Sequence, residues 1–118
     1  MVERLTRPED FHSVYNKGTL KFGKYVVVTA LSLDQSVSRV GYSVSKKIGN
    51  AVTRNRVKRR LREIIRGMAP QIRPGYNIVI GAKRSSPNAA FSELETDLYR
   101  VMQGLGCLDR NTGGEEID

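Results

Sequence analysis

Hydrophobic positions near the N-terminus recur at helical spacing and predict a short helix over roughly residues 7 to 16. Thr6 and Glu9 form a candidate capping box at its start, and Gly18 offers a left-handed stop after it. We therefore expect an amphipathic helix with one aromatic and apolar side. That side carries Phe11, Val14 and Tyr15.

Three later segments have the composition of β-strands, because they are rich in Val, Ile and Tyr and bounded by Gly, Asp, Ser or Pro. They span residues 24–33, 39–45 and 76–82. Since only a short turn at residues 34–36 is left for the connection, we expect the first two strands to pair as a hairpin.

Between the second and third strand candidates, the pattern predicts a helix that begins at residues 52–55 and ends at residues 67–70. At about 100° per residue, its apolar side chains fall in one arc, which we expect to pack on the sheet. These side chains are Val57, Leu61, Ile64, Ile65 and Met68. A last helix is expected over residues 92–104, with Ser92 and Glu95 as its capping box. Its packing stripe is Leu94, Leu98, Val101, Met102 and Leu105.

The chain length of 118 residues allows one ordinary domain, which we place at residues 1–106, with a disordered tail at residues 107–118. No apolar stretch approaches the ~20 residues needed to cross a bilayer, and no secretory signal is visible. We therefore expect a cytoplasmic protein without a membrane partner. Cys107 and His12 are each the single residue of their type, so we assign no disulfide, no metal ligands and no catalytic residues.

Positive charge is concentrated in one part of the chain. The formal net charge is +8, yet ten Lys or Arg and a single acid, Glu63, lie between Arg39 and Arg66. A helix face that is merely solvated normally interleaves both signs, whereas here Glu63 is the only available partner. The segment therefore favours a polyanion such as RNA.

The run from Val44 to Arg66 reads VSKKIGNAVTRNRVKRRLREIIR and combines features that suit phosphate groups. Lys46 and Lys47 follow a strand, and Gly49 permits a close backbone approach. The helix that comes next presents free N–H groups and a positive dipole end. Neither a Walker loop nor a GxGxxG loop is present, so a single nucleotide fits less well than a long polyanion.

This run resembles the RNR signature of the protein subunit of bacterial ribonuclease P, and the similarity extends over most of the chain. The family's RVGxSVSKK strand is matched at residues 39–47 and its IVI strand at residues 78–80. Its N-terminal pattern is matched by Asp10, Phe11, Val14, Tyr15 and Gly18.

The resemblance implies a ribonucleoprotein endonuclease that removes the 5′ leader from precursor tRNA. In that family the large ribonuclease P RNA supplies the active site and binds most of the Mg²⁺ ions. The protein joins this RNA one to one, also binds precursor tRNA, holds no ion tightly and takes no small-molecule substrate.

The fold implied by the resemblance is an α+β two-layer sandwich, similar to ribosomal S5 domain 2. Its elements follow the order α-β-β-β-α-β-α, and its sheet is small and mostly antiparallel. A left-handed β-α-β crossover surrounds the basic helix. Right-handed crossovers dominate in proteins generally, so this expectation rests on the resemblance alone.

Two sets of binding residues follow from the same resemblance. A cleft between the first helix and the sheet would hold the leader, although ordinary packing explains the helix aromatics equally well. Some relatives carry an aromatic near Val28, and Tyr25 or Tyr42 could replace it here, depending on strand register. The leader-binding set is Phe11, Tyr15, Val28 and Ser43. The set that contacts the catalytic RNA is Lys46, Lys47, Asn50, Arg54, Asn55, Arg56, Lys58, Arg59, Arg60 and Arg62.

Three other functions stay open at this point. A ribosomal or RNA-chaperone protein would use the same basic helix on structured RNA without a leader cleft. A DNA-binding protein fits less well, because the helix lies between strands rather than in a helix-turn-helix. A stand-alone nuclease would need a metal cage, and the acids at residues 9–10 and 93–97 are better explained as helix caps.

Overall fold

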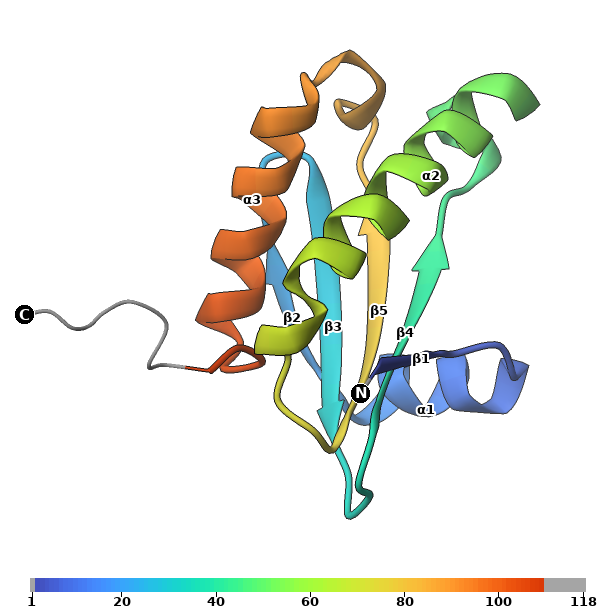
Figure 1. Cartoon of the computed structure of the whole chain (residues 1–118). Helices are drawn as coiled ribbons and strands as arrows, with labels where there is room; N and C mark the ends of the chain where they lie inside the picture. The colour runs from blue at the N-terminus through green and yellow to red at the C-terminus, as the bar shows by residue number, and fades with distance from the viewer. Residues whose placement is uncertain (1, 110–118) are drawn as a thin grey trace, which may run out of the picture.

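The computed structural model describes residues 2–109, which form a five-stranded sheet with three α-helices packed on it (Figure 1). The strands are β1 (Val2–Arg4), β2 (Thr19–Phe22), β3 (Val26–Ser32), β4 (Ser38–Ser43) and β5 (Tyr76–Ala82). The α-helices are α1 (Pro8–Lys17), α2 (Ala51–Met68) and α3 (Phe91–Gly104), and the short 3-10 turns are η1 (Lys46–Ile48), η2 (Ala69–Gln71) and η3 (Ser86–Asn88).

The strand order in the sheet is β1-β4-β5-β3-β2. β3 pairs antiparallel with both of its neighbours, whereas β4 pairs parallel with both of its own. The expected hairpin between residues 24–33 and 39–45 is therefore wrong, because β5 lies between these two strands. Residues 77–80 of β5 are buried on both faces of the sheet, and a strand of this kind belongs at the centre.

The connection from β4 through α2 to β5 has the left-handed sense that the resemblance implied. In Figure 1, β4 and β5 both point upward, α2 crosses in front of the sheet, and β5 lies to the left of β4. A right-handed unit viewed in this way would place the second strand to the right. This connection sets α2 obliquely across the upper half of the sheet.

Helices cover the two faces of the sheet unequally. α2 and α3 pack on one face, and the apolar arcs expected for them are confirmed, with Leu105 partly buried at the end of the stripe. α1 packs on the other face, where Val14 and Leu5 contact Val79. In residues 2–109 no helix has both the length and the apolarity needed to cross a bilayer.

The start and stop of α1 differ from the expected ones. Its N-cap is Arg7, which makes no side-chain capping hydrogen bond, so the capping box of Thr6 and Glu9 is wrong. A proline occupies the first helical position, where its missing N–H costs nothing. Gly18 is not left-handed, since its φ is −80°. It is needed for space, because a Cβ there would lie 2.6 Å from the Val14 carbonyl oxygen.

The acids at the start of α3 also have other partners. Glu93, rather than the expected pair of Ser92 and Glu95, caps the helix by accepting the Ala90 N–H at 2.8 Å. Asp97 is buried and caps no helix. Its carboxylate accepts the backbone N–H groups of Lys24, Tyr25 and Val26 at 2.8, 2.8 and 3.2 Å. Asp97 therefore fixes the turn between β2 and β3.

The domain continues past the boundary expected at residue 106. Cys107 and Leu108 are buried, and Leu108 forms a β-bridge with Ile72. The Arg73 N–H donates to the Cys107 carbonyl oxygen at 2.8 Å. Residues 107–109 thus belong to the folded domain, and the rest of the expected tail, residues 110–118, lies outside the described residues.

Candidate nucleic-acid interface

The start of α2 is built by a glycine and an asparagine. Gly49 has a φ of 154°, a conformation that favours glycine, and it turns the chain out of η1. Asn50 is the N-cap, and its side-chain oxygen accepts the Thr53 N–H at 2.9 Å. Lys46 and Lys47 are exposed on η1, immediately before this helix end. The structure therefore brings all of the expected residues before α2 to its positive end.

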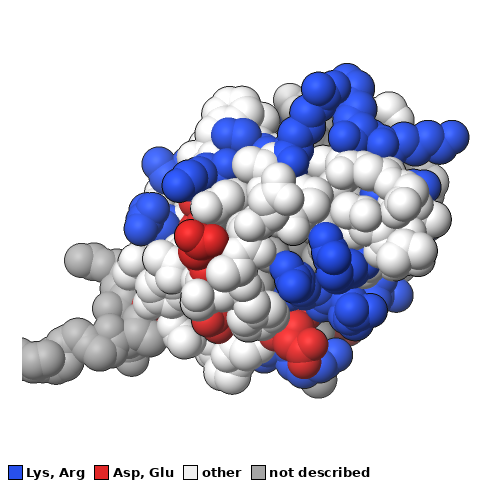
Figure 2. Space-filling model, turned by 90° about the horizontal axis from the view of Figure 1, so that it is seen from above, with Lys and Arg blue, Asp and Glu red and all other residues white. Residues whose placement is uncertain are grey.

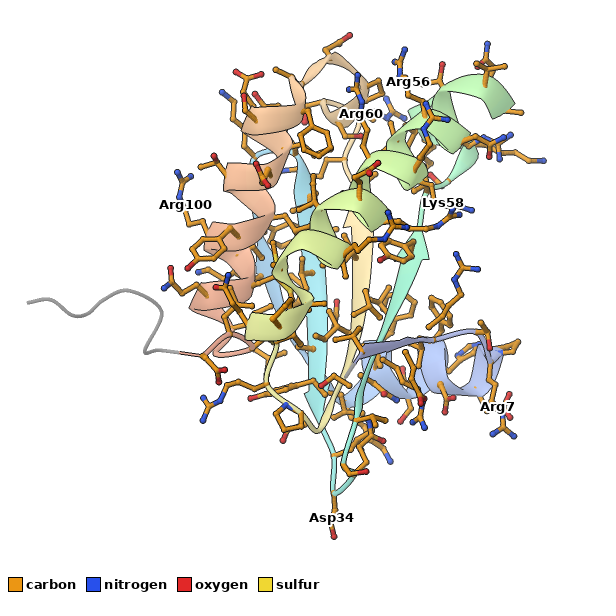
Figure 3. All side chains as sticks on the ribbon, viewed as in Figure 1. Arg7, Asp34, Arg56, Lys58, Arg60 and Arg100 are labelled. Carbon is orange, nitrogen blue, oxygen red and sulfur yellow. The ribbon has the colours of Figure 1, made fainter. Side chains whose placement is uncertain are left out.

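The basic side chains of α2 point to two sides of the helix (Figure 3). On one side, Arg56 and Arg60 donate to the carbonyl oxygens of Pro87 and Ala89 at 3.4 and 3.2 Å. On the other side, Lys58 points toward the β1 edge of the sheet. Arg56 and Arg60 therefore also tether the segment around η3, a structural role that their sequence spacing did not reveal.

The remaining residues of the expected set lie along the same helix. Asn55 and Arg59 are exposed, whereas Arg62 is half-buried. Arg54 is also half-buried, and its Nε donates to the Gly49 carbonyl oxygen at 3.2 Å. The structure thus places this set on α2 and the turn before it.

Few acids neutralise this basic surface. Within residues 2–109, the ion pair of α2 joins Arg66 to Glu63 at 3.7 Å, with 76% and 58% of the two side chains exposed. Such an exposed pair contributes little. Viewed from the end of the sheet at which β4 and β5 finish, Lys and Arg cover much of the surface and acids only small areas (Figure 2). The face attracts polyanions.

A second surface lies on the sheet face that carries α1. The strand registers align four residues in one row across β4, β5, β3 and β2. α1 does not cover this row, since each member is at least partly exposed and Phe22 is 67% exposed. We call it the open row, and it consists of Ser43, Gly81, Val27 and Phe22.

The two aromatics of α1 border the open row in different ways. Phe11 is half-buried and packs on Gly41, next to the row. Tyr15, one helical turn later on the same side, is 53% exposed. Packing thus accounts for Phe11, while Tyr15 is available to a ligand. At the far end, the Lys83 Nζ lies 5.8 Å from the centroid of the Phe22 ring and adds a cation.

Two expectations for this surface were wrong, because the residues concerned face the other side of the sheet. Val28 is fully buried and faces α2 and α3, so it cannot border the open row, and Val27 takes that place. Tyr25 and Tyr42 also pack on the face of α2 and α3. Phe22 was missed because β2 was not recognised, although the apolar residues Leu20 and Phe22 alternate with the polar residues Thr19 and Lys21 as strand residues do.

The described acids do not form a cation site. Among residues 2–109, no three His, Cys, Asp or Glu side chains converge in a way that would hold a metal ion. These described residues therefore do not fit the Mg²⁺ that the resemblance implies for cleavage.

Comparisons with known proteins agree on one family. The family model described as Ribonuclease P matches residues 2–106. The ribonuclease P protein component of Clostridioides difficile is 40% identical over 100 residues, covering 84% of this chain and 88% of that protein. The corresponding protein of Streptococcus pneumoniae is 34% identical over 113 residues, covering 96% and 92%.

Solved structures give the same result. The ribonuclease P protein of Staphylococcus aureus superposes with a TM-score of 0.83 at 28% identity, covering 90% of this chain and 97% of that one. The protein of Thermotoga maritima gives a TM-score of 0.79 at 28% identity, with 86% and 96% covered. The chain belongs to the bacterial ribonuclease P protein family.

Proposed function

We propose that this chain is the RNA-binding subunit of a ribonuclease P ribonucleoprotein that removes the 5′ leader from precursor tRNA. It would join one catalytic RNA in the cytoplasm and contact the precursor tRNA at the same time. The RNA would supply the active site and bind the Mg²⁺ ions of the cleavage reaction. The protein's part is to bind and orient the two RNAs.

The observation that carries this proposal is the presence of two separate surfaces suited to RNA. The face of α2 holds a dense set of cations with a single weak ion pair among residues 2–109, which suits it to an external polyanion. The open row lies on the opposite side of the sheet and offers aromatic and small residues. We propose that α2 binds the catalytic RNA and that the open row binds the leader.

The open row has the chemistry of a site for single-stranded RNA. Tyr15 and Phe22 expose aromatic rings, and each base that stacks on such a ring gains about 1–3 kcal/mol without regard to sequence. Lys83 supplies a positive charge beside Phe22. A binder of structured RNA alone would have no use for this combination, which favours leader binding over the ribosomal or chaperone function.

The experiment that tests leader binding uses the reconstituted ribonucleoprotein with precursor tRNA and with mature tRNA. We expect Phe22→Ala to weaken binding of the precursor by about five-fold or more and to leave binding of mature tRNA unchanged. The control is Phe91→Ala, which removes an exposed ring at the start of α3. Equal losses for both tRNAs, or equal effects of the two variants, would contradict the proposal.

A further inference from the structure

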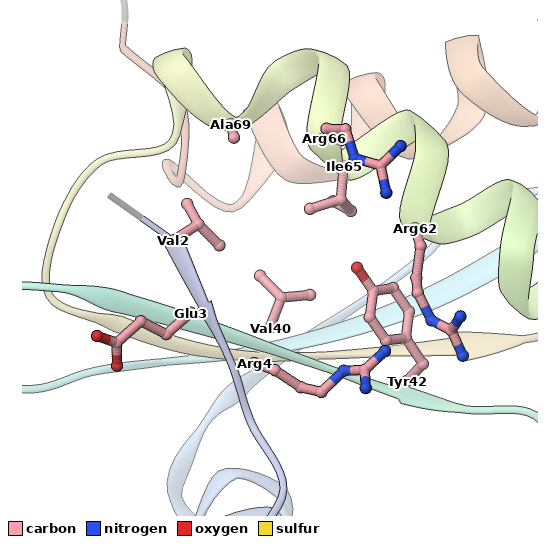
Figure 4. Close-up of a pocket in the computed structure, with 9 residues that line it drawn as sticks. All are labelled: Val2, Glu3, Arg4, Val40, Tyr42, Arg62, Ile65, Arg66 and Ala69. Carbon is pink, nitrogen blue, oxygen red and sulfur yellow. The ribbon is translucent and has the colours of Figure 1, made fainter.

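A hollow of about 260 Å³ opens between α2 and the edge strand β1, at the border of the basic face of α2, with which it shares Arg62 and Arg66 (Figure 4). Its floor is apolar and includes Val40 and Ile65, whose side chains face each other in the view. Guanidinium groups from two elements lie beside Tyr42, on one side of this floor. They belong to Arg4 on β1 and to Arg62 and Arg66 on α2.

These three guanidinium groups have few partners within the described part of the chain. Glu3 also borders the hollow, but its carboxylate pairs with Arg39 at 3.2 Å. Arg66 has only its exposed contact with Glu63. The Nε of Arg62 is buried and has no hydrogen-bond partner among residues 2–109. A buried donor without an acceptor costs free energy, which a bound anion would recover.

Tyr42 adds a further donor at the same place. Its hydroxyl points into the hollow and has no hydrogen-bond partner among residues 2–109 (Figure 4). Burial raises the pKa of Tyr42 to about 12, against the opposing effect of Arg62, Arg4 and Arg66. The hydroxyl therefore keeps its proton at neutral pH and remains able to donate to a ligand.

A second hollow of about 230 Å³ continues from the first. The two share Arg4, Tyr42 and Arg62, and the second one extends to Lys58 and Phe11. If one nucleotide of an RNA strand occupied the first hollow, the sugar-phosphate backbone of that strand would therefore reach the cations of α2. The site is continuous with the basic face rather than isolated from it.

We propose that the hollow beside β1 holds one unpaired nucleotide of a bound RNA. Its phosphate would lie against the guanidinium groups of Arg4, Arg62 and Arg66. Its base would rest on the apolar floor and accept a hydrogen bond from the Tyr42 hydroxyl. A bare phosphate would leave the apolar floor without a partner, whereas a nucleotide uses both parts of the site. This inference rests on the proposed RNA-binding function.

The first test is an NMR titration of the isolated protein, following the Tyr42 ring and the Arg62 Nε–H. The probes are uridine 5′-monophosphate and, separately, inorganic phosphate. We expect both signals to shift with the nucleotide at several-fold lower concentration than with phosphate. Equal concentrations would reduce the site to a simple anion site and overturn the nucleotide proposal, as would the absence of any shift.

The second test measures affinity for a bacterial ribonuclease P RNA. Tyr42→Phe removes only the hydroxyl, and we expect it to weaken binding about five-fold without changing the unfolding transition. Arg66→Gln should weaken binding more than Arg100→Gln, which removes the same charge from the exposed surface of α3. If Tyr42→Phe binds the RNA with wild-type affinity, the proposed nucleotide site is overturned. If the wild-type protein fails to bind this RNA, the proposed function fails, and the nucleotide titration still decides the site by itself.

Discussion

The ring of Phe11 lies against Gly41, in the space that the Cβ of any other residue would occupy. This contact joins α1 to the middle of β4, and Val14 continues the same interface on Val79 of β5. The position of α1 in turn leaves the open row uncovered on its far side. A single glycine in β4 thus determines how closely the helix approaches the proposed leader site.

Replacing this glycine tests the contact directly. We expect Gly41→Ala to push Phe11 out of place and to lower the free energy of unfolding by about 1–3 kcal/mol, as overpacked cores do. Urea unfolding measures the change. Gly67→Ala is the control, because nothing lies within 4 Å of an added Cβ there and alanine favours the helix. Wild-type stability of Gly41→Ala would show that α1 is not held by this contact.

Asp97 should stabilise the fold through the turn between β2 and β3. Its buried carboxylate accepts three backbone N–H groups, so we expect Asp97→Asn to lower the free energy of unfolding by about 3 kcal/mol. The exposed Glu95→Gln on the same helix should change it by less than about 0.5 kcal/mol. Because the turn follows Phe22, leader binding should fall as well in Asp97→Asn. Similar urea midpoints for both variants would refute this role.

Neighbouring arginines on α2 should behave differently. Arg59 is exposed and makes no hydrogen bond or ion pair within residues 2–109. Arg59→Ala should therefore weaken RNA binding, reduce the salt slope of the affinity by about one, and leave stability unchanged. Arg60 also donates to the Ala89 carbonyl oxygen, so Arg60→Ala should additionally lose about 1 kcal/mol of stability. RNA affinity at several salt concentrations and urea unfolding separate the two effects. Identical unfolding of both variants would argue against the tether.

Stability should fall at alkaline pH because of Cys107. Burial raises the pKa of this thiol from 9.0 to about 12, so the unfolded chain releases the proton first. The stability that the protonated Cys107 thiol contributes is fully present below pH 9.0 and is lost as pH rises toward 12. Urea unfolding at a series of pH values should show a shallower decline for Cys107→Ala than for the wild type. A residual decline is expected from Tyr42, whose pKa is raised in the same direction.

Local signals in the sequence were sufficient to predict the basic helix α2. The arc from Val57 to Met68 was predicted because helical periodicity depends only on neighbouring residues, and the structure buries all five of its side chains. The start of α2 was placed at most a few residues late, since Asn50 caps it. The resemblance, and not the periodicity, supplied the hand of the crossover.

Features that depend on distant partners could not be predicted in this way. The hairpin failed because β5, more than thirty residues later in the chain, inserts between β3 and β4. The prediction that Val28 binds the leader was wrong because a shift of one residue along a strand exchanges the two faces of the sheet. Asp97 and Gly41 have clear roles only once β2, β3 and α1 have been placed against them.

The most direct test of the proposed function is cleavage of precursor tRNA at low Mg²⁺ by a bacterial ribonuclease P RNA, with and without this protein. We expect the protein to accelerate removal of the 5′ leader, and we expect the gain to disappear when Arg56 and Arg59 are replaced by alanine in a chain that still folds. An unchanged cleavage rate, despite salt-sensitive binding of the RNA by the wild-type protein, would contradict the account and favour a binder of structured RNA.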